Sequence, residues 1–468
     1  MTKTKKNGFS KALFLSIVAL AWPTMLQELL QTAVQYIDTA MVGTLGTAAT
    51  AAVGATTTIN WLVNSTISAI GIGFLAFISQ AFGAGNRNLA KKASSQAVLL
   101  TIISGLVFTA LCLGLSSFVP KWMQVESGIR DMAAMYFFVL YSPMLFRAAI
   151  IIFGTVLRSV GDTKTPMIVG LIVNIINVIL NFLLIYPTRI VEIFGLRLTV
   201  FGADWGVLGA GAASAIAFVI GGVIITVVFW CHPEVSPKGQ SFKFNKDILK
   251  PCFKVALPNA LQRFGTCMGY VAFAAMVNSL GEVSTAAHTI ANTVESAFYI
   301  PGYGMQAAAA TLAGNALGAK DGDKIRALCK MLIIIEVVLM IISGGLLFIF
   351  APNMMTIFSK DSSVILLGTI VLRMVALSEP FYGVSIIVEG MMQGMGKTLM
   401  PFVANILGMW GIRIVGTFIC TQIFGLGLVS AWGCMILHNL LLFVTFAVYL
   451  ISGRYNPLGK NQSKLHKN

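Results

Sequence analysis

One stretch of the sequence combines regularly spaced polar side chains with an otherwise apolar segment. Thr24, Gln27, Gln31, Gln35 and Asp38 recur at steps of three and four residues, which places them on one face of a helix. A carboxylate inside a hydrophobic span costs about 3 kcal/mol or more at the centre of a bilayer, and it is tolerated where it faces a protein cavity. We therefore predict that Asp38 presents an ionisable group to a cavity. The alternative is a position at the membrane surface, capping the next turn of chain.

Pro23 stands at the start of this polar face. Proline removes one backbone hydrogen bond and kinks helices. We expect a bent helix that carries Asp38 near its end.

The composition is that of an integral membrane protein. The chain has 468 residues, of which 57% are hydrophobic and 10% charged, against about 25% charged in soluble proteins. The net charge of +15 is not arranged as a basic stripe with interleaved aromatic residues, so we expect no nucleic-acid partner. The seven cysteines have no spacing typical of a metal site or a disulfide framework. The first apolar run is long and contains Glu28, which favours a retained membrane helix over a signal peptide.

Apolar segments of about the length that a bilayer requires follow one another along the whole chain. We predict an all-α fold with about twelve transmembrane helices. The predicted spans are 12–37, 48–79, 93–118, 132–156, 166–187, 205–230, 253–279, 285–317, 328–351, 364–392, 400–421 and 426–452.

The 32 Lys and Arg residues are concentrated on one side of these spans. They gather in the N-terminal segment, in alternate loops, between the sixth and seventh spans, and in the C-terminal tail. The other side holds only Lys121, Arg130, Arg189, Arg197 and Lys360. Because positive charge accumulates on the cytoplasmic side, we predict a multi-pass protein of the plasma membrane, in bacteria the inner membrane, with both termini in the cytoplasm.

The sequence is also an internal repeat. Pro23 and Pro258 are 258 − 23 = 235 residues apart, and this offset recurs without a gap over about 140 residues. The matched pairs include Gln27/Gln262, Met41/Met276, Gly46/Gly281, Gly83/Gly318, Gly161/Gly396 and Pro166/Pro401. Since each half has about six helices, the halves share an orientation and a substrate site is expected between them. We predict an N-lobe at 1–231, a cytoplasmic linker at 232–252, and a C-lobe with the tail at 253–468.

These motifs resemble the multidrug and toxic compound extrusion (MATE) family of secondary transporters over nearly the whole chain. The resemblance is carried by YIDTAMVGTLG, SQAFGAGN and its repeat GNALGAKD, GTVLRSVGDTKTP and its partner EGMMQGMGKTLMP, and ALPNALQ. It implies two six-helix bundles that form a V-shaped cleft with alternating access. It further implies export of drugs and bulky, amphipathic organic cations, coupled to inward flow of H⁺ or Na⁺.

The resemblance also implies a cation-coupling site in the N-lobe. Asn174, Asn177 and Asn181 share one helical face. Asn177 and Asn181 match the family's paired amide or carboxylate positions, Ser214 matches its hydroxyl position, and Asp38 matches its first-helix acid. One carboxylate with neutral oxygens suits a hard monovalent cation or a proton carrier. The alternative for the asparagines is hydrogen bonding between helices. We expect no cofactor and no metal other than a Na⁺ ion at Asp38.

The second half departs from the sodium-coupled branch of the family, whose acids in the seventh and tenth helices are replaced here by Thr266 and Tyr382. Other polar residues recur at helical spacing, and they are candidates for lining the substrate cleft together with Gln27, Gln31 and Gln35. They are Gln262, Thr266 and Tyr270, then Asn292 and Glu295, then Tyr382 and Glu389. Alternatively, Glu295 and Glu389 pair internally with Arg263 or Arg413, and Arg147 neutralises an acid.

Two other functions are weighed against a cation-coupled exporter. A flippase for lipid-linked precursors would share the fold but needs a strongly cationic cleft, whereas the first-helix face carries amides and an acid. A membrane enzyme would need convergent catalytic groups, and the four histidines are widely scattered. No Walker-type phosphate loop is present, so we expect no enzymatic activity and no ATP-driven transport. The expected partners are organic cations and membrane lipid, and we expect a monomer.

Overall fold

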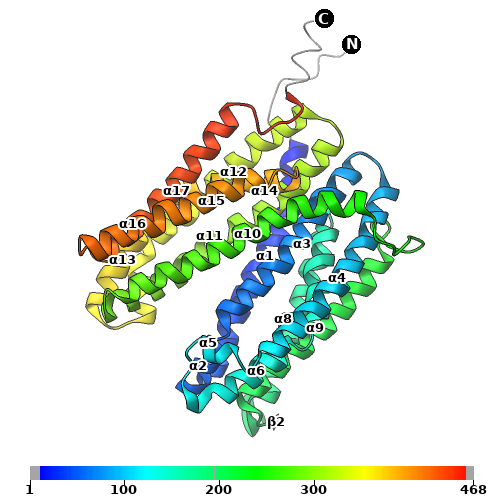
Figure 1. Cartoon of the computed structure of the whole chain (residues 1–468). Helices are drawn as coiled ribbons and strands as arrows, with labels where there is room; N and C mark the ends of the chain where they lie inside the picture. Colours follow the sequence, from blue (N-terminus) through cyan, green and yellow to red (C-terminus); the bar gives the residue numbers. More distant parts are fainter. Residues whose placement is uncertain (1–10, 194–195, 460–468) are drawn as a thin grey trace, which may run out of the picture. The chain divides into compact units, whose positions relative to one another are not determined.

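The chain folds almost entirely into α-helices, joined by short turns and one β-hairpin (Figure 1). The computed structural model describes residues 11–193 and 196–459, without the side chains of residues 191–198. Helices dominate because a backbone segment in lipid has no water to bond with, and a helix satisfies its own N–H and C=O groups.

The first half contains nine helices and the hairpin within the described residues. They are α1 (Lys11–Gly43), α2 (Thr47–Gly54), α3 (Thr57–Gly83), α4 (Arg87–Leu115), α5 (Val119–Trp122), the 3-10 turn η1 (Ser127–Ile129), α6 (Arg130–Tyr141), α7 (Met144–Ser159), α8 (Lys164–Leu184), β1 (Pro187–Ile193), β2 (Leu196–Ala203) and α9 (Gly206–Cys231).

The second half contains longer helices and two π-helical stretches. They are α10 (Lys246–Asn278), α11 (Glu282–Gly318), α12 (Gly322–Phe358), α13 (Ser362–Ala376), α14 (Glu379–Gly394), α15 (Leu399–Ile406), η2 (Leu407–Ile414), α16 (Val415–Phe418), η3 (Ile419–Ile423) and α17 (Leu428–Ile451).

Each predicted span falls on one helix, a helix pair or the interrupted helix from α15 to η3. In the described part of the chain, eight helices are long and apolar enough to cross a membrane, or ten when two bent pairs each count as one span. The bent pairs are α6–α7 and α13–α14, at 50° and 53°. The remaining predicted spans, α10 and α11, have the length but carry polar residues along it. The all-α membrane fold class is confirmed.

The internal repeat is confirmed in the helix boundaries. The bounds of α10 are those of α1 moved by 235 residues, and the bounds of α14 are those of α7 moved by the same offset. The turns that precede α2 and α11 contain Gly46 and Gly281, with φ of 108° and 100°. This conformation is open to glycine and rarely adopted by other residues, so the two turns share a physical cause.

Contacts divide the chain into two compact units. We call Leu29–Phe74 with Arg87–Leu249 the N-unit, and Met1–Glu28, Leu75–Asn86 and Lys250–Asn468 the C-unit. The predicted N-lobe differs from the N-unit because the beginning of α1 and the end of α3 belong to the C-unit by their contacts. One such contact is the hydroxyl of Thr24, which donates to the carbonyl of Gly304 at 2.9 Å.

The C-unit contains a close crossing of α3 and α11. A Cβ atom on Gly83 would lie 2.0 Å from the carbonyl oxygen of Asn315, and one on Gly318 would lie 1.9 Å from that of Gln80. Gly83 and Gly318 are repeat partners at the offset of 235, and so are Gln80 and Asn315. The crossing is therefore reciprocal, and it depends on small residues as close helix pairs in membranes do.

The N-unit packs α9 against α8 and α6 in the same way. The Cβ positions of Gly209 and Gly211 would meet the backbone of Leu184 and the ring of Tyr136. The small residues GVLGAGAASAIA thus allow α9 to approach both neighbours closely, which brings Ser214 near α8.

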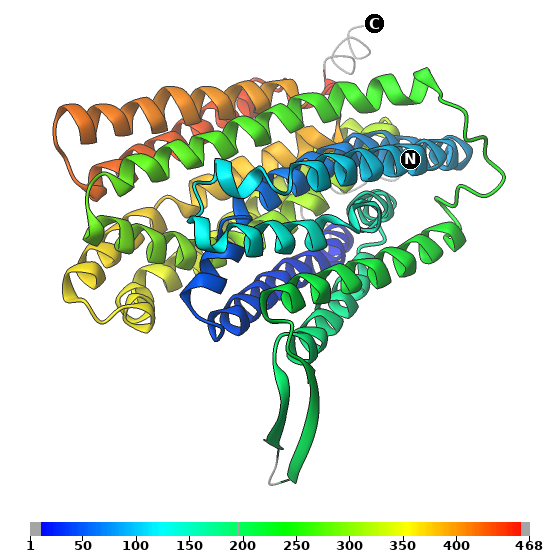
Figure 2. The same ribbon diagram turned by 60° about the horizontal axis from the view of Figure 1, so that its bottom comes forward.

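Two local features were not predicted from the sequence. Where no helix was expected, between the spans ending at 187 and beginning at 205, β1 and β2 pair antiparallel between the end of α8 and the start of α9 (Figure 2). The span expected at 400–421 is interrupted by the π-helical stretches η2 and η3. Helical periodicity alone does not distinguish the i+5 hydrogen bonds of a π-helix from the i+4 bonds of an α-helix.

Candidate functional site

Asp38 lies in the N-unit beside the asparagines of α8. Its carboxylate oxygen Oδ1 accepts a hydrogen bond of 2.6 Å from Nδ2 of Asn181. Asn177 and Asn181 are buried, with 6% and 1% of their surface exposed, whereas Asp38 is half-buried. Because the two asparagines are four residues apart, one face of α8 presents both amides to α1. The structure therefore brings together the acid and the amides that the sequence singled out.

The amide of Asn177 has two orientations with different consequences. In one, Nδ2 donates to Oγ of Ser214 at 2.9 Å, and Oδ1 faces the carboxylate of Asp38. In the other, Nδ2 donates to Oδ1 and Oδ2 of Asp38 at 2.9 and 3.1 Å, and Oδ1 accepts from Ser214 at 2.9 Å. The second orientation gives a bare carboxylate additional N–H donors, and it places Nδ2 of Asn177 at 3.2 Å from Nδ2 of Asn181. The first becomes favourable when a proton or cation lies between the oxygens.

Polar atoms of four side chains form one hydrogen-bonded network in the N-unit, because Nδ2 of Asn181 donates to both Asp38 and Oδ1 of Asn177, and Asn177 contacts Ser214. Oδ1 of Asn181 is buried and has no hydrogen-bond partner among the described residues. The carboxylate of Asp38 and the amide oxygen of Asn177 face each other in the first orientation, and they are donors of the kind that a hard monovalent ion prefers. The set fits Na⁺, and it equally fits a proton held on the carboxyl of Asp38 and shared with an amide oxygen.

In the C-unit, Glu389 is surrounded by amides. Its Oε1 accepts from Nε2 of Gln262 at 2.9 Å and of Gln393 at 3.1 Å, and its Oε2 accepts from Nδ2 of Asn405 at 3.3 Å. No ion pair within 4 Å joins Glu389 to an arginine in the described part of the chain, and Nε of Arg263 donates to Oδ1 of Asn259 at 3.0 Å. A carboxylate with three amide donors is stabilised without a cationic partner.

An aromatic cluster accompanies these groups in the C-unit. The hydroxyls of Tyr303 and Tyr382 are 3.1 Å apart, and the ring of Tyr299 meets both residues edge to face. The guanidinium of Arg413 lies over the rings of Tyr270 and Phe273, at 4.8 and 4.3 Å from their centroids. The predicted pairing of Arg413 with Glu295 is not formed as an ion pair within 4 Å in the described part of the chain. Arginine is held by ring faces instead.

The structure does not bring the remaining candidates for lining the substrate cleft together in one site. Glu295 is buried with 7% exposed, whereas Asn292 on the same helix is exposed. Gln27 and Thr266 are half-buried, and Gln31 and Gln35 are exposed on α1. Their assignment as cleft-lining residues stays a prediction.

Three buried charged residues have surroundings that the sequence did not predict. Glu336 and Glu379 are 0% and 1% exposed, and both oxygens of Glu336 have no hydrogen-bond partner among the described residues. A Glu within the apolar run MLIIIEVVLMII was a visible signal. Arg147 donates to Oδ1 of Asn60 at 2.6 Å and lies over the ring of Phe218 at 4.8 Å. It therefore contacts an amide and rings rather than the acid expected.

The chain matches the MatE family model twice, over residues 23–183 and 258–419. A probable multidrug resistance protein NorM from Thermotoga maritima is 27% identical over 446 residues, covering 94% of this chain and 92% of that protein. A probable multidrug resistance protein YoeA from Bacillus subtilis is 24% identical, covering 88% of this chain and 87% of its own length.

Solved structures show the same fold. An outward-facing multidrug resistance MATE family transporter of the MOP superfamily superposes with a TM-score of 0.86 at 21% identity, covering 98% of this chain and all of that one. A MOP superfamily transporter from Pyrococcus furiosus, described as having a binding pocket of reversed polarity, gives 0.85 at 21% identity over 98% and 99% of the two chains. The two family matches coincide with the two halves of the internal repeat, and this multi-pass membrane protein belongs to the MatE family of transporters.

Proposed function

We propose that this protein is a multidrug efflux transporter that works as a secondary antiporter. It exports organic cations or drugs from the cell by alternating access, coupled to inward flow of H⁺ or Na⁺. The observation that carries the proposal is the carboxylate of Asp38 within hydrogen-bond distance of two buried amides of α8, because an ionisable group in an apolar helix is retained for function. The multidrug resistance relatives support the same cargo class.

The coupling follows from the two orientations of Asn177. When a proton or Na⁺ is bound at Asp38, the orientation with the amide oxygen of Asn177 toward the carboxylate is favoured. When the proton or Na⁺ leaves, the orientation with the amide nitrogen toward the carboxylate is favoured. The exchange changes the contacts between α1 and α8. A ligand shifts a conformational equilibrium only by its difference in affinity for the two states. Cation binding at Asp38 and cargo binding must therefore weaken each other by the same factor.

The cargo class follows from the side chains on offer. Glu389 and the tyrosines near it provide negative charge and ring faces, which attract amphipathic organic cations through charge and cation–π contacts. We place the protein in the plasma membrane, as a monomer with both termini cytoplasmic. The terminal residues 1–10 and 460–468 lie outside the described residues, and their location rests on the distribution of Lys and Arg.

The proposal is tested with Asp38→Asn in inside-out vesicles, with the pH and Na⁺ gradients imposed separately. We expect loss of gradient-driven efflux of a cationic dye with unchanged membrane insertion and unfolding temperature. Asp131→Asn, an acid outside the network, is the matched control and should transport normally. Full efflux by a well-expressed Asp38→Asn variant would refute the coupling role.

Binding of dye to the purified protein tests the cargo class. A cationic dye should bind less tightly as external H⁺ or Na⁺ rises, and an anionic dye should bind poorly throughout. Tighter binding of the anionic dye would instead favour a flippase for lipid-linked precursors, whose cargo carries pyrophosphate.

A further inference from the structure

The segment between α9 and α10, residues 232–245, is folded against the helices of the N-unit, to which it belongs, and we call it the strap. The hydroxyl of Ser236 donates to the carbonyl of Trp230 at 2.6 Å. The ring of Phe242 stacks on that of Trp230, with centroids 6.0 Å apart and planes 10° apart. The strap therefore turns back onto the last turn of α9 instead of leaving the helices.

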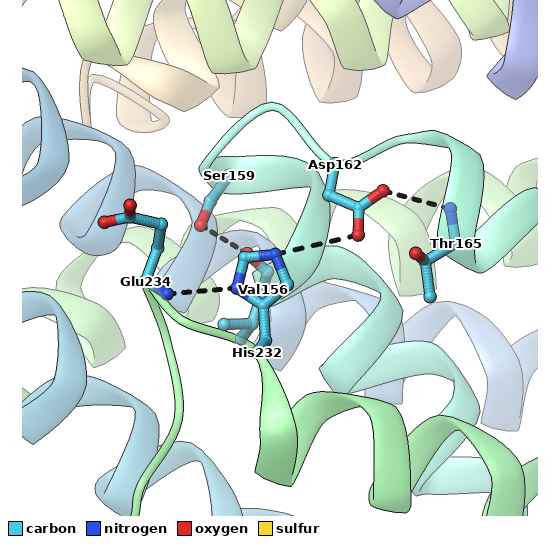
Figure 3. Close-up of polar contacts among 6 residues, drawn as sticks. All are labelled: Val156, Ser159, Asp162, Thr165, His232 and Glu234. Atoms are coloured by element: carbon cyan, nitrogen blue, oxygen red, sulfur yellow. Dashed lines mark hydrogen bonds and ion pairs between the residues drawn. The ribbon is translucent and has the colours of Figure 1, made fainter.

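The beginning of the strap is tied to two neighbouring elements. Nε2 of His232 lies 3.7 Å from Oδ2 of Asp162, whose Oδ1 accepts from the backbone N–H of Thr165 at 3.0 Å (Figure 3). Glu234 pairs with Arg87 at the start of α4, with 2.8 Å between Oε2 and Nε. These contacts fix the strap to the ends of α4 and α8.

The end of the strap lies on two buried side chains of α4. The hydroxyl of Ser95 donates to the carbonyl of Ser241 at 3.0 Å, and Nε2 of Gln96 donates to that of Lys243 at 2.9 Å. Oε1 of Gln96 accepts from the N–H of Asn245 at 3.0 Å. Ser95 and Gln96 are 1% and 2% exposed, so they form a fixed floor beneath the strap.

Above this floor is a cavity of about 370 Å³ whose charged side chains are all basic. Lys92, Lys243 and Lys246 line it, and neither Asp nor Glu occurs among its lining residues in the described part of the chain. Asp247 is adjacent but exposed, and its backbone N–H is already bonded to Asn245 at 2.9 Å. Three lysines that line one polar cavity, without a carboxylate among the lining residues, favour an anion.

Phe244 lines the same cavity, and Phe242, which stacks on Trp230, stands two residues before it. Phe242 and Phe244 alternate with lysines in the stretch FKFNK, and they are 42% and 62% exposed. Aromatic side chains next to lysines are typical of segments at the membrane interface, where rings enter the headgroup region. The strap also lies on the side of the chain that is rich in Lys and Arg, which faces the anionic lipids of the cytoplasmic leaflet.

We propose that the cavity between the strap and α4 binds a phosphate-bearing anion, the headgroup of an acidic phospholipid. The three lysines supply the charge, and Ser95 and Gln96 hold the strap in place around it. The aromatic residues keep the site at the level of the headgroups. The proposal is independent of the cargo and the coupling ion.

The test titrates the full-length purified protein in neutral detergent with dioctanoyl phosphatidylglycerol or dioctanoyl phosphatidylcholine, and counts bound lipid by native mass spectrometry. We expect binding of the anionic lipid only. Each of Lys92→Gln, Lys243→Gln and Lys246→Gln should weaken it about fivefold, and the triple variant about 100-fold. Lys238→Gln, an exposed lysine of the strap outside the cavity, is the matched control and should leave affinity unchanged.

Three results would overturn the proposal. Equal losses from Lys238→Gln and the cavity variants would show diffuse attraction rather than a site. If phosphatidylcholine binds as tightly as phosphatidylglycerol, the cavity does not select an anionic headgroup. Displacement of the lipid by millimolar inorganic phosphate or glycerol 3-phosphate, each binding as tightly as the lipid, would assign the cavity to a free phosphate. The unfolding temperature and dye efflux of each variant establish that the protein remains folded.

Discussion

The reciprocal glycine crossing of α3 and α11 gives a sharp prediction about stability. Gly318→Ala places a methyl carbon 1.9 Å from the carbonyl oxygen of Gln80, and Gly83→Ala places one 2.0 Å from that of Asn315. A Cβ atom essentially never lies within 3.0 Å of a heavy atom from another part of the chain, so the helices must separate by about 1 Å or more. The obstacle is backbone, which cannot rotate away as a side chain does.

The magnitude follows from two opposing effects. Alanine is favoured over glycine inside a helix by about 1 kcal/mol. Overpacking costs about 1 to 3 kcal/mol and occasionally more, and a clash with backbone belongs at the upper end. We expect each variant to lose about 2 kcal/mol or more of unfolding free energy. The double variant should lose less than the sum, because the first methyl group already separates the helices.

The assay is thermal unfolding of the purified protein in detergent, followed by intrinsic fluorescence. Gly345→Ala in α12 is the matched control, since its Cβ would meet nothing within 4 Å. It should leave the unfolding temperature unchanged or raise it. A normal unfolding temperature for both Gly83→Ala and Gly318→Ala would show that α3 and α11 do not cross as described.

Two further predictions concern the polar groups. Asn177→Ala and Asn181→Ala should weaken the dependence of export on the coupling cation by about 1 to 2 kcal/mol each, measured as the half-maximal H⁺ or Na⁺ concentration for dye efflux. Asn174→Ala, one turn earlier on α8, is the control. An equal effect of this variant would show that the hydrogen bonds of Asn177 and Asn181 with Asp38 have no specific role in coupling. Glu336→Met should raise the unfolding temperature, because it replaces a buried carboxyl that has no partner among the described residues. A fall would reveal a partner for that carboxyl.

Much of the fold was predictable because its determinants are local or periodic. Apolar length predicts membrane helices, and the offset of 235 residues predicts paired boundaries such as those of α1 and α10. The hairpin at 187–203 was missed because its alternating pattern is short and lies between two strong helical signals. The bends between α6 and α7 and between α13 and α14 were missed because apolar periodicity continues through them.

The candidate site divides in the same way. Helical spacing singles out Asp38 and places Asn177 and Asn181 on one face, and the family resemblance connects them and adds Ser214. Only the tertiary structure puts Nδ2 of Asn181 at 2.6 Å from Asp38, because that distance depends on how closely α9, α8 and α1 pack. The lysines of the strap cavity are likewise unremarkable in the sequence. They come from α4, the strap and α10, and they share a cavity because Ser95 and Gln96 hold the strap on α4.

The sequence by itself determined the class of protein, the order of its apolar helical segments, the repeat and the identity of the acid on α1. These depend on transfer of side chains into lipid and on helical periodicity, which act along the chain. The tertiary structure alone decided that amides rather than arginines surround Glu389, that rings and an amide hold Arg147, and that Gly83 and Gly318 form one crossing. A buried polar or charged group takes whichever partner the packing brings within about 3 Å, and residues far apart in the chain reach that distance only when the helices assemble.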